Sequence, residues 1–295
     1  MSTDFHCGYI ALVGRPNVGK STLLTRILGQ KISITSRRPQ TTRHRVLGIK
    51  TRPGAQLIYV DTPGIHDYSG RAMNRHMNRT ASSVLADVDV VVFLVDGLRW
   101  QPDDELVLQK LGQVRCPVIL AVNKIDLLAS RETLLPGLQA LAEKYSFEQI
   151  IPISASKGDN VAALEAAIEE LLPAAPPLFP EDQVTDRPVR FLAAELVREK
   201  LFRKLGRELP YGLAVEIEQF REEAGMSHIH ALIWVERQSQ KSIVIGKQGR
   251  MLKEIGQQAR RDIEALVGGR VNLKLWVKVK EGWADDERAL RSLGY

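Results

Sequence analysis

The hydrophobic pattern of roughly the first 172 residues predicts an α/β domain. Short apolar runs alternate there with longer stretches in which apolar residues recur at helical spacing. The runs are rich in β-branched residues and lack polar alternation, which favours strands buried on both faces of a mostly parallel sheet with helices on either side. The predicted strands are 9–13, 57–60, 90–95, 118–122 and 150–153.

The pattern changes after a Pro-rich stretch at 173–180, which is typical of a semi-rigid connector. Beyond it, apolar spacing predicts elements in the order α-β-β-α-α-β, with the long helix at 250–267 and the last strand at 271–279. We therefore expect a small α+β domain to follow the first one. The predicted divisions are a domain at 1–172, a linker at 173–189, a second domain at 190–282 and a tail at 283–295.

A glycine-rich loop follows the first predicted strand and opens the first predicted helix. The sequence GRPNVGKS at 14–21 matches the phosphate-loop pattern G-x-x-x-x-G-K-[ST] at every fixed position. Backbone N–H groups of such a loop point at phosphates, the lysine reaches the β- and γ-phosphates, and the serine hydroxyl binds Mg²⁺. The predicted nucleotide contacts are Gly14, Arg15, Pro16, Asn17, Val18, Gly19, Lys20, Ser21 and Thr22.

Three further motifs follow predicted strands, at the edge of the sheet where nucleotide loops belong. Asp61-Thr62-Pro63-Gly64 offers a carboxylate that can hold Mg²⁺ through water and a glycine N–H for the γ-phosphate. In Asn123-Lys124-Ile125-Asp126, the Asp126 carboxylate can accept both the N1 hydrogen and the exocyclic amine of guanine, a pair that adenine lacks. Ser154-Ala155-Ser156 could turn a backbone N–H toward the guanine carbonyl.

Taken in this order, the four motifs resemble the translation-factor-related class of P-loop GTPases over about residues 8–172. The resemblance implies GTP hydrolysis with Mg²⁺ and a switch threonine between the first helix and the next strand. Here that segment is 36–43, and its spacing does not decide between Thr41 and Thr42. The candidate metal ligands are Ser21, Thr42 and Asp61, and the candidate catalytic residues are Asn17, Lys20, Thr41, Thr42 and Gly64.

The chain departs from many signalling GTPases directly after its Asp-x-x-Gly motif. Those enzymes carry a glutamine there that orients the attacking water, whereas this chain has Ile65. Ile65 can neither orient water nor neutralise the charge that develops in the transition state. The positive charge must therefore come from another group, either an arginine from a partner or a bound cation. Related GTPases with asparagine at the place of Asn17 hold a monovalent cation, so K⁺ is a further candidate cofactor; the alternative is that Asn17 only stabilises the turn.

A second glycine motif, Gly246-Lys247-Gln248-Gly249, joins two predicted helices in the second domain. A bare G-x-x-G is usually only a turn, but this one precedes a strand whose outward face carries basic residues. The arrangement resembles a KH domain of the prokaryotic (type II) topology over roughly 190–282, which implies binding of about four nucleotides of single-stranded RNA. The predicted RNA contacts are Ile245, Gly246, Lys247, Gln248, Gly249, Arg250, Lys274 and Lys278.

The two domains together, with the string QTTRHR at 40–45, resemble the bacterial Era GTPase family over essentially the whole chain. That resemblance implies an assembly factor of the small ribosomal subunit that binds 16S ribosomal RNA near its 3′ end, with a peripheral association with the inner membrane. The alternatives are an RNA-binding scaffold with structural GTP and a membrane-surface signalling GTPase. GTP turnover raised by RNA or ribosomal subunits would exclude the scaffold, and a preference for RNA over anionic lipid would exclude the membrane protein.

Charge and cysteine content fit an anionic partner in a reducing compartment. The net charge is +6, and the basic excess is local: seven basic and no acidic residues at 31–52, and eleven basic against three acidic residues at 237–280. Two distant cysteines do not suggest a disulfide framework, and no apolar stretch is long enough to span a bilayer. We therefore expect a cytoplasmic protein that acts as a monomer.

Overall fold

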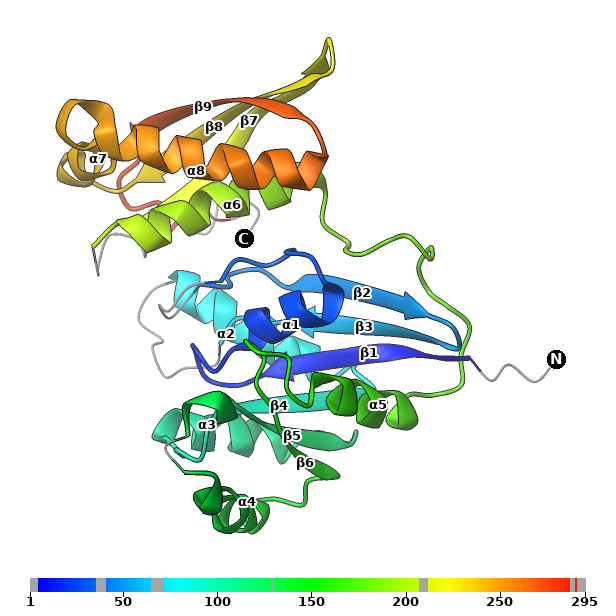
Figure 1. Ribbon diagram of the computed structural model, residues 1–295. Coiled ribbons are helices and arrows are strands. Elements are labelled where there is room, and N and C mark those ends of the chain that lie inside the picture. The colour runs from blue at the N-terminus through cyan, green and yellow to red at the C-terminus, as the bar shows by residue number, and fades with distance from the viewer. Residues whose placement is uncertain are drawn as a thin grey trace. The chain divides into compact units, whose positions relative to one another are not determined.

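The computed structural model describes residues 5–35, 41–64, 72–128, 130–206, 212–286 and 290. It divides the chain into two compact units, shown in Figure 1. Unit 1 consists of Met1–Tyr68 and Met77–Asp186, and unit 2 of Ser69–His76 and Arg187–Tyr295. The Pro-rich segment therefore belongs with unit 1, and the division after Asp186 falls inside the linker predicted at 173–189.

Unit 1 is built on a six-stranded sheet with strand order β2-β3-β1-β4-β5-β6. β1 pairs in parallel with β3 and β4, and the parallel pairing continues through β5 to β6, whereas β2 and β3 are antiparallel. The predicted mostly parallel sheet is confirmed. The strands are β1 (His6–Val13), β2 (Val46–Arg52), β3 (Ala55–Asp61), β4 (Val90–Asp96), β5 (Val118–Asn123) and β6 (Gln149–Pro152).

Strand β2 is the element of this sheet that the apolar runs did not predict. It carries a glycine inside it and ends in basic residues, both of which weaken the usual strand signal. Gly48 lies close to helix α1 (Lys20–Leu28): a Cβ there would be 2.7 Å from Leu24 Cδ1 and 2.8 Å from Leu28 Cδ1, so any larger residue would make these side chains shift. The residue that weakens the strand pattern is therefore the one that lets the helix approach the sheet.

Helices cover both faces of the sheet, as Figure 1 shows. On one face, α2 (Ala72–Val84), α3 (Pro102–Leu111) and α4 (Leu134–Ala142) contribute to a buried cluster with the strands. The helices α1 and α5 (Val161–Leu171) lie on the other face. This two-sided cover explains why the parallel strands read as continuous apolar runs.

The segment after α5 is held along unit 1 by backbone pairing. Cys7 donates its N–H to the carbonyl of Pro173, and the buried Gln56 amide bonds the backbone of Leu178 and Phe179. Farther on, Ile49 of β2 donates its N–H to the carbonyl of Val184 (2.8 Å). The segment therefore extends the edge of the sheet instead of spanning open solvent.

Unit 2 has a three-stranded sheet of order β7-β8-β9 with α6 and α8 packed on one face (Figure 1). β7 and β8 are antiparallel, and β8 and β9 are parallel. The predicted order α-β-β-α-α-β is confirmed. The elements are α6 (Val189–Lys204), β7 (Leu213–Glu223), β8 (Met226–Val235), α7 (Gln238–Ile245), α8 (Arg250–Val267) and β9 (Arg270–Val279), with a 3-10 turn (Lys247–Gly249) before α8.

Both cysteines are free thiols, Cys7 buried and Cys116 half-buried. Among the residues that the structure describes, no helix combines the length and the hydrophobicity that crossing a membrane requires.

Candidate functional site

The phosphate loop runs from the end of β1 into α1, as the motif requires. Gly14 and Gly19 have φ angles of 150° and 109°, and a Cβ would lie 2.5 Å from the carbonyl oxygen of Leu94 at the first and 2.2 Å from Asn123 Nδ2 at the second. Gly64 of the Asp-x-x-Gly motif lies against the same loop, since its Cβ would be 2.9 Å from the backbone nitrogen of Pro16. Glycine at all three places therefore lets the loop pack closely against its neighbours in the conformation expected of a phosphate-binding loop.

Lys20 is buried at the start of α1 with its ammonium group turned to the loop. Its Nζ donates to the carbonyl oxygens of Gly14 (2.8 Å) and Arg15 (3.0 Å). Burial lowers the pKa of Lys20 to about 8, against the opposing attraction of Asp61. A cation kept this dry interacts strongly with phosphate, because water does not screen it.

Three oxygen ligands converge beside Lys20. Ser21 Oγ donates to Asp61 Oδ2 (2.9 Å) and lies 3.0 Å from Thr42 Oγ1, which is itself 3.5 Å from Asp61 Oδ2. Of the two switch threonines left open by the sequence, Thr42 makes these contacts. The second oxygen of Asp61, Oδ1, is buried and has no hydrogen-bond partner among the residues that the structure describes. Two hydroxyls and a carboxylate with a spare oxygen fit Mg²⁺ bound directly or through water.

Asn123 joins the phosphate loop to the predicted base-binding turn. Its Nδ2 donates to the carbonyl oxygen of Val18 (2.7 Å), and its Oδ1 accepts the N–H of Ala155 (2.9 Å). Asn123 is buried, so both bonds are shielded from water. The contact that we predicted between a backbone N–H of this turn and the guanine carbonyl stays a prediction.

Asp126 is positioned by the hydroxyls of the same turn. Ser154 Oγ donates to Oδ1 (2.6 Å) and Ser156 Oγ to Oδ2 (3.3 Å). The Ser154 hydrogen bond is the main cause that lowers the pKa of Asp126 below its ordinary value. The side chain is exposed, and its carboxylate stays ionised and oriented, which is what acceptance of two guanine donors needs.

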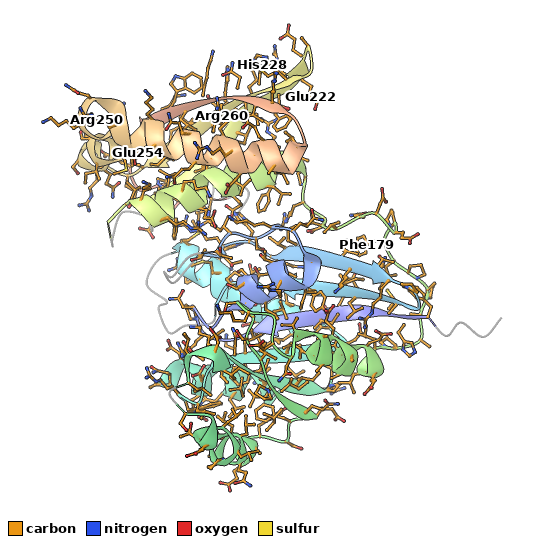
Figure 2. All side chains as sticks on the ribbon, viewed as in Figure 1. Phe179, Glu222, His228, Arg250, Glu254 and Arg260 are labelled. Carbon is orange, nitrogen blue, oxygen red and sulfur yellow. The ribbon has the colours of Figure 1, made fainter. Side chains whose placement is uncertain are left out.

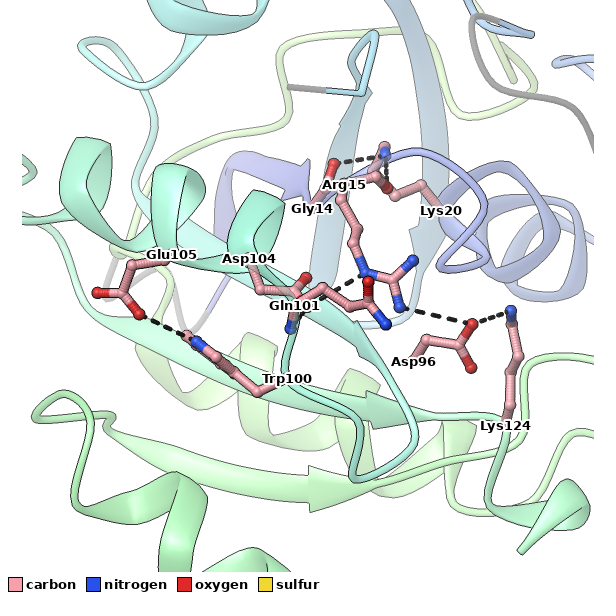
Figure 3. A network of polar contacts seen from close by, with 9 residues as sticks. All are labelled: Gly14, Arg15, Lys20, Asp96, Trp100, Gln101, Asp104, Glu105 and Lys124. Carbon is pink, nitrogen blue, oxygen red and sulfur yellow. Dashed lines mark hydrogen bonds and ion pairs between the residues drawn. The ribbon is translucent and has the colours of Figure 1, made fainter. Parts of the chain in front are cut away.

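Figure 3 shows a polar network behind the phosphate loop that the sequence did not predict. Arg15 Nε donates to the buried Asp104 Oδ2 (3.1 Å), and its Nη2 lies 3.7 Å from Asp96 Oδ2. Lys124 Nζ pairs with the same Asp96 oxygen at 2.6 Å. Arg15 and Lys124, one from each nucleotide motif, are thus held by a shared carboxylate.

Some signals for these partners were present in the sequence. Asp96 ends an apolar strand at the loop edge of the sheet, where functional carboxylates gather. Asp104 is the third residue of α3, and it accepts the N–H of Gln101 (2.9 Å) in a capping box that has Pro102 at the first helical position. Capping alone would explain Asp104, so its reach to Arg15 was not predictable from the pattern.

A groove in unit 2 lies between α8 and β9 and encloses about 450 Å³. Its apolar wall is formed by Leu252, Leu273 and Leu275. Gly256 of α8 also lines the groove and has no side chain to fill it; a Cβ there would lie 3.4 Å from Leu275 Cδ1. Polar side chains complete the lining. They are Lys253, Gln257 and Arg260, and Figure 2 shows Arg260 projecting from α8.

The Gly-x-x-Gly turn opens this groove, since Gly249 lines it and α8 begins at Arg250. Gly246 and Gly249 have φ angles of 72° and 76°, and Gln248 between them has 54°. A Cβ on Gly249 would have no heavy atom within 4 Å, so the backbone there is open to an approaching molecule. Lys247, Gln248 and Arg250 are exposed around the turn, and Ile245 is half-buried at the end of α7.

The structure does not bring Lys274 and Lys278 into this groove. They alternate along β9 with the groove residues Leu273 and Leu275, so they lie on the opposite face of the sheet. Lys278 Nζ lies 3.3 Å from Glu218 Oε1 on that face. The sequence identified both lysines as outward-facing and counted them among the RNA contacts of the glycine motif. Because side chains alternate along a strand, the two lysines face away from the groove that this motif borders.

The family of the chain follows from comparison with known proteins. A family model described as a 50S ribosome-binding GTPase matches residues 9–124, and one described as a KH domain matches residues 208–284. The GTPase Era of Marinobacter nauticus is 60% identical over 291 residues, which cover 99% of this chain and 95% of that protein. The chain belongs to the Era GTPase family. GTPase Era of Pseudomonas aeruginosa is likewise 58% identical over 301 residues, 99% of each chain.

Solved Era structures agree with this assignment. An Aquifex aeolicus Era variant bound to GDP·AlF4⁻ matches with a TM-score of 0.96 at 41% identity, over 99% of each chain. Era in complex with MgGDPNP and nucleotides 1506-1542 of 16S ribosomal RNA matches with a TM-score of 0.95 at 42% identity, again over 99% of each chain. The Era-family chain is therefore a GTPase, with the predicted P-loop GTPase and KH domains.

Parts of the predicted Era site lie outside the described residues. They are the switch I residues 36–40, Ile65 directly after the Asp-x-x-Gly motif, and most of the C-terminal tail. The neighbouring site residues Thr41 and Gly64 are described.

Proposed function

We propose that this Era-family GTPase binds single-stranded RNA of the 16S 3′-terminal region in the groove of unit 2 and takes part in small-subunit maturation. The observation that carries the proposal is the open backbone of the Gly-x-x-Gly turn at the mouth of a groove with an apolar wall and a basic rim. KH domains clamp about four nucleotides against such a turn. The Era complex with nucleotides 1506-1542 of 16S ribosomal RNA supports the choice of RNA.

The groove has the chemistry that this ligand needs. Lys247, Arg250 and Lys253 are exposed around the turn and the first part of α8, where phosphates would lie beside the helix N-terminus. The leucine wall offers apolar surface to bases, and Gln257 and Arg260 offer hydrogen bonds to their edges. Backbone, phosphate and base contacts would thus be available within one groove.

A substitution at Gly249 tests the proposal. Gly249→Asp should lower affinity for the 1506-1542 segment by about tenfold or more, because a carboxylate would face the phosphates, and it should lower the salt slope of binding by about one. The matched control is Gly249→Asn, which has the same shape, tolerates positive φ and carries no charge. Binding is measured by fluorescence anisotropy over a range of salt concentrations, with GTP binding as the check on unit 1.

The Gly249 variant tests RNA binding more specifically than a variant in which both Gly246 and Gly249 are replaced. A Cβ on Gly246 would lie 2.6 Å from Met251 Cβ, so a side chain there disturbs the turn itself, whereas the space beside Gly249 is open. Equal RNA affinity of the aspartate and asparagine variants would contradict the proposal and leave the turn with only a structural role.

We further propose that GTP hydrolysis uses Mg²⁺ held by Ser21, Thr42 and Asp61, and K⁺ beside Asn17. The side chain of Asn17 is exposed and makes no hydrogen bond with a described residue, while its backbone has a φ of 67°. Its carbonyl oxygen is therefore free to join phosphate oxygens in holding a monovalent cation. That cation would supply the positive charge that an arginine finger supplies elsewhere.

Hydrolysis should then be faster in potassium than in sodium at equal ionic strength, by about tenfold or more, below the roughly 10³ of an arginine finger. Asn17→Gly should abolish the difference, because glycine keeps the positive φ and removes the carbonyl. Asn17→Asp keeps an oxygen and should retain much of it. Steady-state phosphate release measures both, and equal wild-type rates in the two salts would contradict the K⁺ proposal and leave a group supplied by a partner as the better explanation.

The role in subunit maturation rests on the family and on the proposed RNA contact. Peripheral association with a membrane, a cytoplasmic location and the monomeric state stay predictions from the sequence.

A further inference from the structure

Unit 2 has a second surface of basic and aromatic residues on the face of its sheet opposite the groove. We call the side chains that point away from α6 and α8 the outer sheet face. Register pairs His230 with Lys274, Leu232 with Trp276 and Trp234 with Lys278 across β8 and β9. The β9 residues of these pairs are exposed.

Trp276 has the geometry of a stacking platform. Its side chain is 41% exposed, although it lies opposite the buried Leu232 in the sheet. The His230 ring meets it in a T-shaped contact with centroids 5.0 Å apart, which fixes the orientation of the indole. An apolar ring that is oriented and still half open to solvent suits the face of a nucleobase.

On the outer sheet face most basic residues lie on β9, and the acidic residues lie on β7. Along β9, Arg270 and Lys274 are exposed and form no ion pair with any residue that the structure describes, while Lys278 pairs with Glu218. The acidic residues of this face, Glu216 and Glu218 among them, come from β7 at the other edge. An anionic strand is therefore favoured along β9 and disfavoured across the sheet.

The basic edge is continuous with the groove. β9 is an edge strand, and its alternate residues face opposite ways: Leu273 and Leu275 line the groove, and Lys274 and Trp276 face outward. A strand that leaves the groove over this edge meets the aromatic and basic side chains within the width of one β-strand. Continuity and charge favour RNA over an acidic protein.

We propose that RNA held in the groove continues over the edge of β9 onto the outer sheet face. A base stacks there on Trp276, and phosphates lie near Lys274 and Arg270. The inference rests on the proposed RNA binding in the groove and extends the length of RNA that one chain contacts.

The test compares two kinds of RNA with the full chain. One probe is the 1506-1542 segment, and the other is a set of single-stranded fragments of about four nucleotides tiled across it, each long enough for the groove alone. Trp276→Ala should weaken binding of the long segment by on the order of tenfold and leave the fragments unaffected. Trp276→Phe should retain most of the affinity, because it keeps an aromatic face.

A charge-matched pair separates this contact from general attraction. Lys274→Ala removes a basic residue from β9, and Arg221→Ala removes one from the same face at β7, where Arg221 pairs in register with His228. We expect only the first to lower affinity for the long segment. Ultraviolet crosslinking of that segment to wild-type protein should label the peptide that contains Trp276, which tests the contact without a variant.

The possible results are distinct. Unchanged affinity of Trp276→Ala for the long segment, equal losses in Lys274→Ala and Arg221→Ala, or crosslinks confined to α7 and α8 would each overturn this inference and leave the groove proposal intact. Self-association lost in Trp276→Ala with RNA binding unchanged would assign the face to a second copy and overturn it too. No loss of RNA affinity in Gly249→Asp would instead contradict the proposed function.

Discussion

An Asp126→Asn variant is expected to lose affinity for GTP by on the order of 10⁴-fold and to prefer XTP. The carboxylate of Asp126 accepts hydrogen bonds, and guanine presents two donors to it. An amide places a donor opposite one of them and leaves a buried pair unmatched in the complex, the situation that gives the largest discrimination between ligands. Xanthine presents an acceptor in place of the exocyclic amine, so the amide suits it better.

Competition binding with GTP and XTP measures this exchange. Ser154→Ala is the matched control, because it removes the 2.6 Å hydrogen bond that orients the carboxylate but keeps the carboxylate itself. That control should lose some affinity and still prefer GTP. If Asp126→Asn also still preferred GTP over XTP, Asp126 would have no place in base recognition.

A Lys20→Met variant is expected to lose GTP affinity by about 10²- to 10⁴-fold. Methionine keeps most of the volume of the side chain and removes the ammonium group, and with it two charge-assisted hydrogen bonds to phosphate worth roughly 1.5 to 3 kcal/mol each. Isothermal titration with GTP measures the loss. An affinity within a few-fold of wild type would contradict the role of Lys20 at the phosphates.

The same variant should be more stable than wild type when nucleotide is absent. Burial lowers the pKa of Lys20 from 10.5 in its unfolded environment to about 8 in the folded chain. Below pH 8 the folded protein therefore bears the full penalty of a buried charge, about 3 kcal/mol, and the penalty disappears as pH rises toward 10.5. Urea unfolding should show a stability gain in Lys20→Met near neutral pH that shrinks at about pH 10.

If Lys20→Met were instead less stable than wild type near neutral pH, the hydrogen bonds of Lys20 to the Gly14 and Arg15 carbonyls would stabilise the folded chain more than burial of the charge destabilises it. The expected result identifies Lys20 as a residue kept for ligand binding at the expense of stability.

The fold was largely predictable because its parallel strands are covered on both faces and its helices have clear ends. The long helix predicted at 250–267 matches α8 because glycines stand at both of its caps. β2 was not predicted, since the strand signal is weakest where an edge strand carries the glycine that α1 packs against. The apolar pattern along a segment predicts burial, whereas the close approach of Gly48 to α1 is a contact between two elements.

The candidate site likewise contains residues that the sequence predicted and contacts that it did not. Lys20, Ser21, Asp61 and Asp126 stand in motifs of fixed spacing, and the structure brings the first three together around the phosphate loop. The pairing of Arg15 with Asp104 joins residues 89 positions apart, and no spacing within either segment specifies it. In unit 2, strand alternation predicted which residues of β9 face outward, but which face holds the groove is decided by where α8 packs.

The hydrogen bonds of β2 connect the candidate metal site to the last residues of unit 1. Thr42, in contact with Ser21 at the proposed metal site, lies a few residues before β2 begins. Within β2, Leu47 donates its N–H to Asp186 Oδ1 (3.0 Å), and Asp186 is the last residue of unit 1. We expect a movement of Thr42 on loss of the γ-phosphate to be transmitted through these bonds to Asp186. The segment that sequence composition marks as a spacer is thus bonded to the strand that follows the candidate metal site.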